Sequence, residues 1–141
     1  ESVLRIDGHG SFLARGIGSR DSTIRRRRRL YPGAMLTIDD FARVELRVAR
    51  VLHAEPHPKA DKLMVLDVAI GDEKRRIVAG IRKHYAAEEL VGKSIVVVAN
   101  LQPATLRGIE SQGMLLAASD DDGRLALVTP EKPIGPGGRV K

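Results

Sequence analysis

Two polar segments of the 141-residue chain carry side chains that could bind a phosphate. The first is residues 56–63, with the sequence PHPKADKL, which offers His57, Lys59 and Lys62. Its two prolines fix the backbone dihedral φ, so these side chains would lose little conformational freedom on meeting an anion. The same composition would suit a rigid connection whose lysines are only solvated. Residue chemistry alone favours neither interpretation.

The second polar segment, residues 100–114, is long for a connection inside a compact domain, and loops of this length are commonly functional. Arg107 presents a planar fork of donors that matches a phosphate. Three further side chains can donate to and accept from base edges or ribose hydroxyls: Asn100, Ser111 and Gln112. Gly108 and Gly113 allow tight backbone geometry, whereas Met114 opens an apolar run and is expected in the core.

Neither catalysis nor metal binding is indicated by the sequence. His53 and His57 are spaced i, i+4, but Pro56 prevents the helix that would align them and no third ligand is evident. The glycines near the N-terminus lack the Lys-Ser/Thr pair and the preceding strand of a phosphate-binding loop. Cysteine is absent, so there is no thiolate ligand and no disulfide. We expect no catalytic residue, no metal and no cofactor.

The elements that must position these segments are mainly strands. Alternating apolar residues predict three of them, at residues 44–51, 64–70 and 76–79. The alternation in the first strand changes phase at Ala49 and Arg50, as a bulge would require. Before it, Thr37 can cap a short helix with an acidic first turn, from which Phe41 is expected to point inward.

The second half of the chain predicts one helix and three more strands. Residues 85–91 suit a short helix that stops at Gly92, and the apolar run 94–99 reads as a buried strand. A hairpin is expected from residues 113–118 and 125–128, with Asp122-Gly123 as the turn signal. A helix between the third and fourth strands is the element order of an OB-fold, a five-stranded Greek-key β-barrel. We therefore predict an all-β domain with one or two short helices over residues 37–141, although SH3-like and other small barrels have similar strand counts.

Positive charge is concentrated before this domain. Residues 1–37 hold eight arginines against three acidic residues, a net charge of +5, whereas residues 38–141 carry only +1. Residues 1–36 show no sustained apolar period and are predicted to form a basic, disordered arm. Its run Arg25–Arg29 fits a nucleic-acid-contacting tail or, as such runs more often are, a solvated linker. The domain itself would have to bind a polyanion through a few placed charges.

Two further expectations follow from composition. The chain has only two Phe, two Tyr and no Trp, so RNA binding would depend more on phosphate contacts and shape than on stacking. No apolar run reaches the length of about 20 residues that spans a bilayer, and the arginine-rich start lacks the apolar stretch of a signal peptide. We expect a cytoplasmic protein with no membrane partner.

Three segments together resemble the tRNA-binding domain appended to methionyl-tRNA synthetase. They are DDFARVELRVARV at 39–51, HPKADKL at 57–63 and VVVANLQPATLRGIESQGMLLA at 96–117, and the resemblance covers about residues 38–141. It implies an OB-fold, binding to the outer corner of tRNA with little sequence preference, homodimerisation, and a methionyl-tRNA synthetase joined to the domain or bound in trans. Family members commonly have Lys where this chain has Gln102 and Thr105, which predicts a reduced affinity.

The function expected from the sequence is therefore a non-catalytic tRNA-binding module. The RNA-contacting candidates are His57, Lys59, Lys62, Asn100, Arg107, Ser111 and Gln112. Two alternatives stay open. Protein-binding chaperones of the CsaA type resemble the domain in fold but lack a clear HPKADKL and SQGML. An inter-subunit docking module could share the barrel, but would have no reason to hold Lys59, Lys62 and Arg107 along one side.

Overall fold

The structure, a computed structural model, describes residues 35–141. The predicted disordered arm, with its arginine run, lies almost wholly outside these residues. Contacts between Cα atoms divide the chain into two units, residues 1–44 and 45–141, and each is described by itself. None of the helices in the described part is long and apolar enough to cross a membrane.

The described end of the first unit holds the short helix α2, Ile38–Ala42. The Thr37 hydroxyl accepts a hydrogen bond from the Asp40 amide, and the Asp40 carboxylate accepts one from the Thr37 amide, both at 3.1 Å. This reciprocal cap confirms the predicted helix start. Phe41 is 40% exposed, so the expectation that it points inward is wrong. A five-residue helix presents too little apolar surface to bury a whole face.

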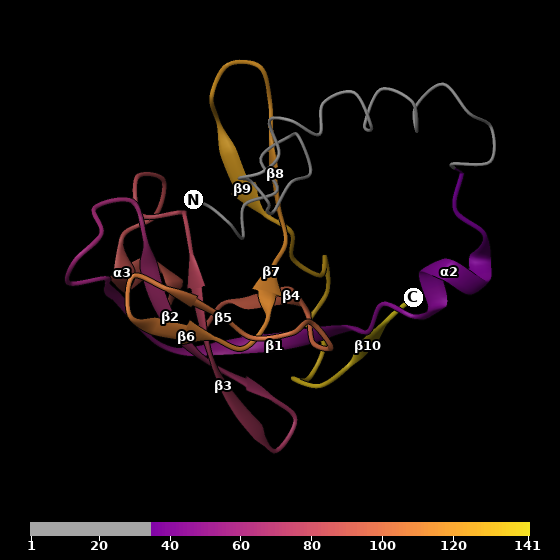
Figure 1. Cartoon of the computed structure of the whole chain (residues 1–141). Helices are drawn as coiled ribbons and strands as arrows, with labels where there is room; N and C mark the ends of the chain where they lie inside the picture. The colour runs from indigo at the N-terminus through magenta and orange to yellow at the C-terminus, as the bar shows by residue number, and fades with distance from the viewer. Residues whose placement is uncertain (1–34) are drawn as a thin grey trace. The chain divides into compact units, whose positions relative to one another are not determined.

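The second unit is built on one curled antiparallel sheet (Figure 1). Its strands lie in the order β3-β2-β1-β4-β7, in which β1, β2 and β3 form a meander and β4 returns to the free side of β1. That order is a Greek key. The bounds are β1 Leu46–Pro56, β2 Met64–Ile70, β3 Glu73–Ala79, β4 Ser94–Val98 and β7 Met114–Leu115. The predicted all-β fold of OB type, a five-stranded Greek key with one or two short helices, is confirmed.

Short elements complete this unit. Strand β10, Arg139–Val140, pairs with the start of β1, and helix α3, Ala87–Leu90, connects β3 to β4 as predicted. Two hairpins branch from the sheet: β5 Ala104–Leu106 with β6 Ile109–Ser111, and β8 Ala117–Ser119 with β9 Leu125–Leu127. The β8–β9 hairpin stands out from the sheet in Figure 1 and confirms the turn predicted after residue 118.

The core fills the concave side of the curled sheet. Alternate residues of each strand face it, as the pleat requires, and they include Leu66 and Val68 of β2 and Ile95 and Val97 of β4, all without exposed surface. Leu90 of α3 is equally buried, so the helix packs against this core.

The first strand differs from its prediction in length and in the place of its bulge. It runs on to Pro56, and the register shift falls between Val51 and His53. Both Ala49 and Val51 face the core, so no phase change occurs at residues 49–50. Val48 projects from the opposite face of the sheet to Ala49, yet it is buried, because the C-terminal segment covers it. The Gly138 carbonyl of that segment accepts from the Val48 amide at 2.8 Å. An apolar residue on this covered face made the alternation appear to change phase.

The segment 100–114 is also different from the irregular loop that was expected. Most of it is the β5–β6 hairpin, which turns on Arg107 and Gly108 with φ angles of 52° and 92°. Two successive residues with positive φ are the mark of a type I′ turn, which matches the twist of the flanking strands. An arginine in the first of these positions concealed the turn in the sequence, since Asn, Asp or Gly is usual there.

Candidate nucleic-acid interface

His57 joins the two polar segments that the sequence singled out. The residue is only 2% exposed. Its ring Nδ1 accepts a hydrogen bond from the Lys59 amide at 2.9 Å, and its Nε2 lies 3.1 Å from the Leu106 carbonyl oxygen at the end of β5. Because Nδ1 is the acceptor, the proton belongs on Nε2, which donates to Leu106. One imidazole therefore holds the loop 57–63 against the β5–β6 hairpin.

Arg107 adds a second link across the same contact. Its Nη2 donates to the Lys59 carbonyl oxygen at 3.3 Å. The loop is closed on itself by the His57 amide, which donates to the Leu63 carbonyl oxygen at 3.0 Å. The cations Lys59, Lys62 and Arg107 are exposed and, within residues 35–141, make no ion pair with an acidic side chain. We call these three residues the basic platform.

Ser111 is a buried support. It is 1% exposed, its hydroxyl accepts from the Val78 amide at 3.0 Å and donates to the Gly113 carbonyl oxygen at 3.0 Å. The side chain therefore ties β6 to β3. Like His57, it lies out of reach of a large ligand, so any part it plays in binding is to hold its neighbours in place.

Gln112 and Asn100 are exposed, but their amide oxygens are already used. The Oε1 atom of the Gln112 side chain accepts from the Arg76 main-chain amide at 3.0 Å. The main-chain amide of Gln112 donates to the Arg76 carbonyl oxygen at 2.8 Å. Asn100 follows β4 and accepts from the Glu45 amide at 2.8 Å. Gln112 thus extends the edge of β3, whereas Asn100 ties the end of β4 to the residue before β1. Gln102 and Thr105 are both exposed.

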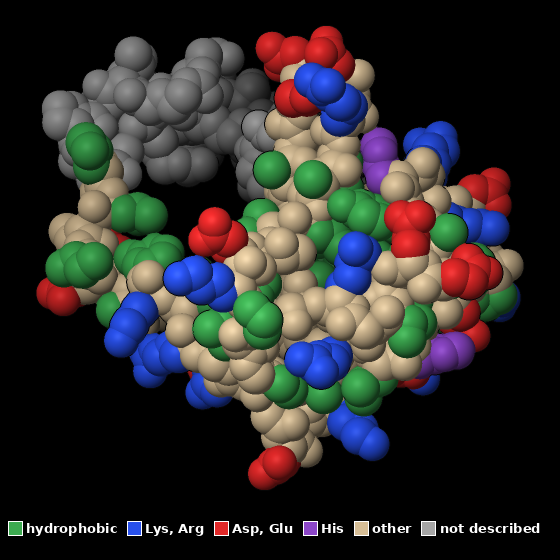
Figure 2. Space-filling view, turned by 180° about the vertical axis from the view of Figure 1, so that it is seen from behind, with side chains coloured by type: hydrophobic (Ala, Val, Ile, Leu, Met, Phe, Trp, Pro, Cys, Tyr) green, Lys and Arg blue, Asp and Glu red, His purple; other side chains and the backbone are tan. Residues whose placement is uncertain are grey.

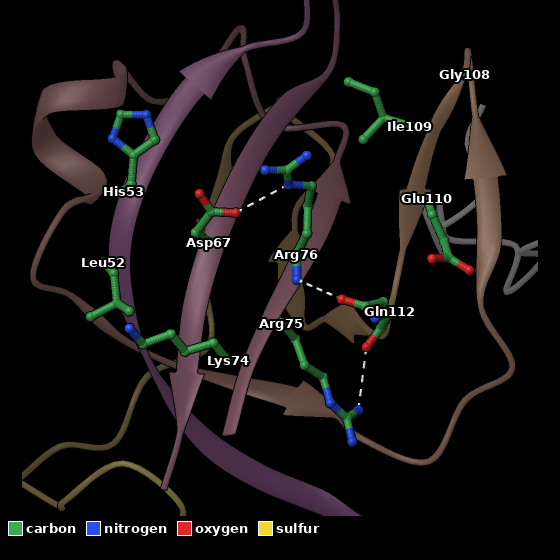
Figure 3. A pocket seen from close by; sticks show the side chains of 10 residues that line it. All are labelled: Leu52, His53, Asp67, Lys74, Arg75, Arg76, Gly108, Ile109, Glu110 and Gln112. Atoms are coloured by element: carbon green, nitrogen blue, oxygen red, sulfur yellow. Dashed lines mark hydrogen bonds and ion pairs between the residues drawn. The ribbon is translucent and has the colours of Figure 1, made fainter. Parts of the chain in front are cut away.

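A groove of about 680 Å3 separates the outer face of the sheet from the β5–β6 hairpin (Figure 3). Its lining residues are Leu52, His53, Asp67, Lys74, Arg75, Arg76, Gly108, Ile109, Glu110 and Gln112. Three strands contribute to one wall, because β1, β2 and β3 lie next to one another in the sheet. Most of these residues were not predicted as site residues.

Arg75 lines one part of this groove and is engaged at both Nε and Nη1. Its Nε pairs with the Glu73 carboxylate at 2.7 Å, and its Nη1 donates to the carbonyl oxygens of Ala99 and Gln112. The hydrogen bond and the charge of Arg75 hold the pKa of the exposed Glu73 carboxyl below its ordinary value. Arg75 therefore braces β3 against the ends of β4 and β6.

Lys74 and Arg76 remain on the outer face of β3. Arg76 pairs with Asp67 of β2 at 3.1 Å, whereas Lys74 is exposed and, in the described part of the chain, has no ion-pair partner. The sequence contained a signal for them, the alternation in EKRRIVA. It was missed because the third strand was predicted to start at residue 76 rather than at Glu73. In that shorter strand Lys74 does not share a face with Arg76.

Charge of one sign does not cover the surface. Figure 2 shows Lys and Arg side chains spread among acidic and hydrophobic ones over the visible face. This agrees with the net charge of +1 for residues 38–141. Attraction of a polyanion to this domain must depend on where a few cations are placed. Among the described residues, no three His, Asp or Glu side chains gather closely enough to hold a metal ion.

The fold and the site define a small OB-type domain with exposed cations on its loops. The profile of the family described as "Putative tRNA binding domain" matches residues 46–139. The chain belongs to this tRNA-binding-domain family.

Sequence relatives agree with that assignment. The methionine–tRNA ligase of Thermotoga maritima is 60% identical over 105 residues, which are 74% of this chain and 16% of the ligase. The methionine–tRNA ligase of Methanococcus aeolicus is 58% identical over 103 residues, 72% of this chain and 15% of the ligase. The chain therefore matches a small part of these much longer proteins.

Solved structures share the fold. A MetRS related protein from Pyrococcus horikoshii superposes with a TM-score of 0.72 at 37% identity, covering 76% of this chain and 98% of that chain. The chaperone CsaA from Bacillus anthracis gives a TM-score of 0.69 at 29% identity, with 76% of this chain and 99% of that chain covered.

Proposed function

We propose that this domain binds tRNA without catalysing a reaction, and that the basic platform contacts the phosphate backbone. The observation that carries the proposal is the set of hydrogen bonds made by His57 and Arg107, which we call the His57 latch. It holds the Lys59 backbone beside Arg107, although the two residues lie on segments far apart in sequence. Cations held in place lose less entropy on binding than cations on free loops. The family assignment and the methionine–tRNA ligase relatives support the choice of tRNA as the polyanion.

We further infer the setting in which the domain works. The relatives are methionine–tRNA ligases, and the chain contains none of the adenylate-forming signatures of such enzymes. A role as a module joined to a methionyl-tRNA synthetase, or acting with one in trans, accounts for both facts. This role belongs in the cytoplasm. A homodimer would double the number of cations offered to one tRNA.

The salt dependence of binding tests the basic platform. Each lost phosphate contact lowers the slope of log K against log salt by about 0.7 to 0.9. Replacing Lys59, Lys62 and Arg107 by Ala should reduce the slope by roughly two units and weaken tRNA binding. A control with the same charge change replaces three exposed cations elsewhere, Arg124, Lys132 and Lys141, and should leave most of the affinity.

Deletion of residues 1–36 separates the arm from the platform. The arm holds more net charge, so its loss should weaken binding to all nucleic acids about equally. The preference for folded tRNA over poly(U) or a duplex of equal length should survive. If the platform variant binds tRNA like the parent while the arm deletion abolishes binding, the barrel is not the RNA-binding surface and the proposal fails.

A second candidate function has its own observation in its favour. Two CsaA chaperone structures match with TM-scores of 0.69 and 0.70 at 29% and 28% identity. A titration with an unfolded polypeptide discriminates between the functions. Binding of the polypeptide more tightly than tRNA, unchanged in the platform variant, would favour the chaperone. Binding of neither would favour an inter-subunit docking module.

A further inference from the structure

Three side chains form a row across the outer face of the sheet. The strand register places His53 of β1 opposite Asp67 of β2, and Asp67 opposite Arg76 of β3. Directly opposed residues of antiparallel strands project from the same face, with Cβ atoms about 5 Å apart. The bulge at Leu52 creates this row, because without the extra residue His53 would not share a face with Asp67.

The row presents two flat groups to the groove. The Asp67 carboxylate binds Arg76 through Nε at 3.1 Å, which leaves the guanidinium plane open, and the Arg76 side chain is 52% exposed. The His53 side chain is 60% exposed, 3.6 Å from the Glu55 carboxylate. Unpaired bases stack on imidazole rings and on guanidinium planes as well as on Phe, Tyr and Trp. The described residues that line the groove include no Phe, Tyr or Trp, so stacking there would depend on His53, Arg75 or Arg76, and Arg75 is engaged at Nε and Nη1.

The rest of the groove suits the other parts of a nucleotide. Ile109 of the hairpin supplies an apolar contact on the facing wall, and Gly108 leaves room beside it. Lys74 extends from β3 toward one end of the groove, and Ile109 lies at the other end (Figure 3). In the next row of the sheet Lys74 and Arg50 flank the small Ala69, and both cations are exposed. Glu110 lies on the hairpin side and would repel a phosphate there, which leaves the Lys74 end for it.

We propose that this groove takes one unpaired nucleotide of the bound RNA, with its base stacked on Arg76 and His53 and its phosphate at Lys74. The inference rests on the proposed function and extends it from phosphate contact to recognition of a base outside a helix. It modifies the expectation that binding depends more on phosphate contacts and shape than on stacking: aromatic residues are scarce, yet Arg76 and His53 can replace them for a single base.

Three RNA hairpins of equal length test this inference. One is fully paired, one carries a single extruded nucleotide, and one carries an extruded abasic site. Stacking of one base contributes enough to predict a preference of about five- to hundredfold for the extruded nucleotide over the other two RNAs. The abasic hairpin should bind like the paired one, because it offers the same backbone without the base.

Variants then assign the preference to the groove. Arg76→Lys keeps the positive charge and removes the plane, so it should abolish the preference while the salt slope stays unchanged. His53→Ala should reduce the preference and His53→Phe should retain it. Lys74→Ala should instead lower the salt slope by about one unit and leave the preference. Thermal unfolding of each variant confirms that it is folded.

The outcomes separate this inference from the proposed function. Equal binding of the parent to all three hairpins overturns the nucleotide site and leaves tRNA binding by the platform intact. A preference that persists in folded Arg76→Lys and His53→Ala proteins overturns it as well. No binding to any hairpin or to tRNA overturns the proposed function, and this inference with it.

Discussion

At the scale of single residues, His57 shows how a candidate ligand can act as a support. Both ring nitrogens are used inside the protein, one by the Lys59 amide and one by the Leu106 carbonyl. A buried group that loses such a partner costs about 1–3 kcal/mol, more than the bond contributes when it is made. The side chain thus couples the stability of the domain to the geometry of the basic platform.

Replacement of His57 should lower the stability of the domain and disturb the geometry of the basic platform. His57→Ala leaves the Lys59 amide and the Leu106 carbonyl without partners, and we expect the free energy of unfolding to fall by about 2–4 kcal/mol. His57→Asn keeps an acceptor for the Lys59 amide and should lose about half as much. Urea denaturation measures both, with an unchanged m-value. Equal stability of the Ala variant and the parent would contradict the latch.

At the scale of elements, two turns meet where the C-terminal segment crosses the sheet. Gly71, in the β2–β3 turn, has φ of 63°, and Gly137 has φ of 98°. A Cβ at Gly137 would lie 2.9 Å from the Gly71 nitrogen and 3.0 Å from its Cα. The Gly137 amide also donates to the Val48 carbonyl oxygen at 2.7 Å. This close approach lets the segment cover β1 and set the start of β10.

Gly137→Ala should therefore lower the free energy of unfolding. It combines a left-handed backbone with contact against backbone atoms that cannot move aside, and we expect a loss of about 3 kcal/mol or more in unfolding free energy. Gly123→Ala is the matched control, since Gly123 has φ of 84° but no atom within 4 Å of its Cβ position. That variant should lose only about 1–2 kcal/mol. Similar denaturation midpoints for the two would refute the close-approach argument.

At the scale of the whole molecule, the distribution of charge and of exposed apolar surface decides how the protein meets partners. The arm carries +5 and residues 38–141 only +1. Val128 and Ile134, near the C-terminal end of the barrel unit, are 39% and 44% exposed. Exposed aliphatic side chains near a Gly- and Pro-rich tail suit a contact between two copies, in line with the dimer that the family resemblance implies.

We expect the protein to be a homodimer in solution. Light scattering coupled to size exclusion should give twice the monomer mass, because exposed apolar side chains gain from mutual burial. Val128→Asp with Ile134→Asp should shift the mass toward the monomer, whereas Leu52→Asp, on the groove side, should not. A monomeric mass for the parent at tens of micromolar protein would count against the dimer.

The sequence by itself determined the order and type of most elements. Alternation predicted β2 at its observed bounds, the cap at Thr37 predicted α2, and the Asp-Gly pair predicted the β8–β9 turn. These signals are local: a strand's period, a capping side chain and a turn residue act within a few positions. Together with the helix between the third and fourth strands they predicted an OB-type barrel, and the family resemblance implied the same fold.

Only the tertiary structure decided which faces are covered and which residues meet. Val48 is buried because a segment some 90 residues later lies on it, and that cover shifted the apparent phase of β1. His57 and Ser111 are buried by the β5–β6 hairpin and β3, not by their neighbours in sequence. The row of His53, Asp67 and Arg76 exists only once three strands are in register. Burial and juxtaposition depend on contacts between distant segments, and no local pattern records them.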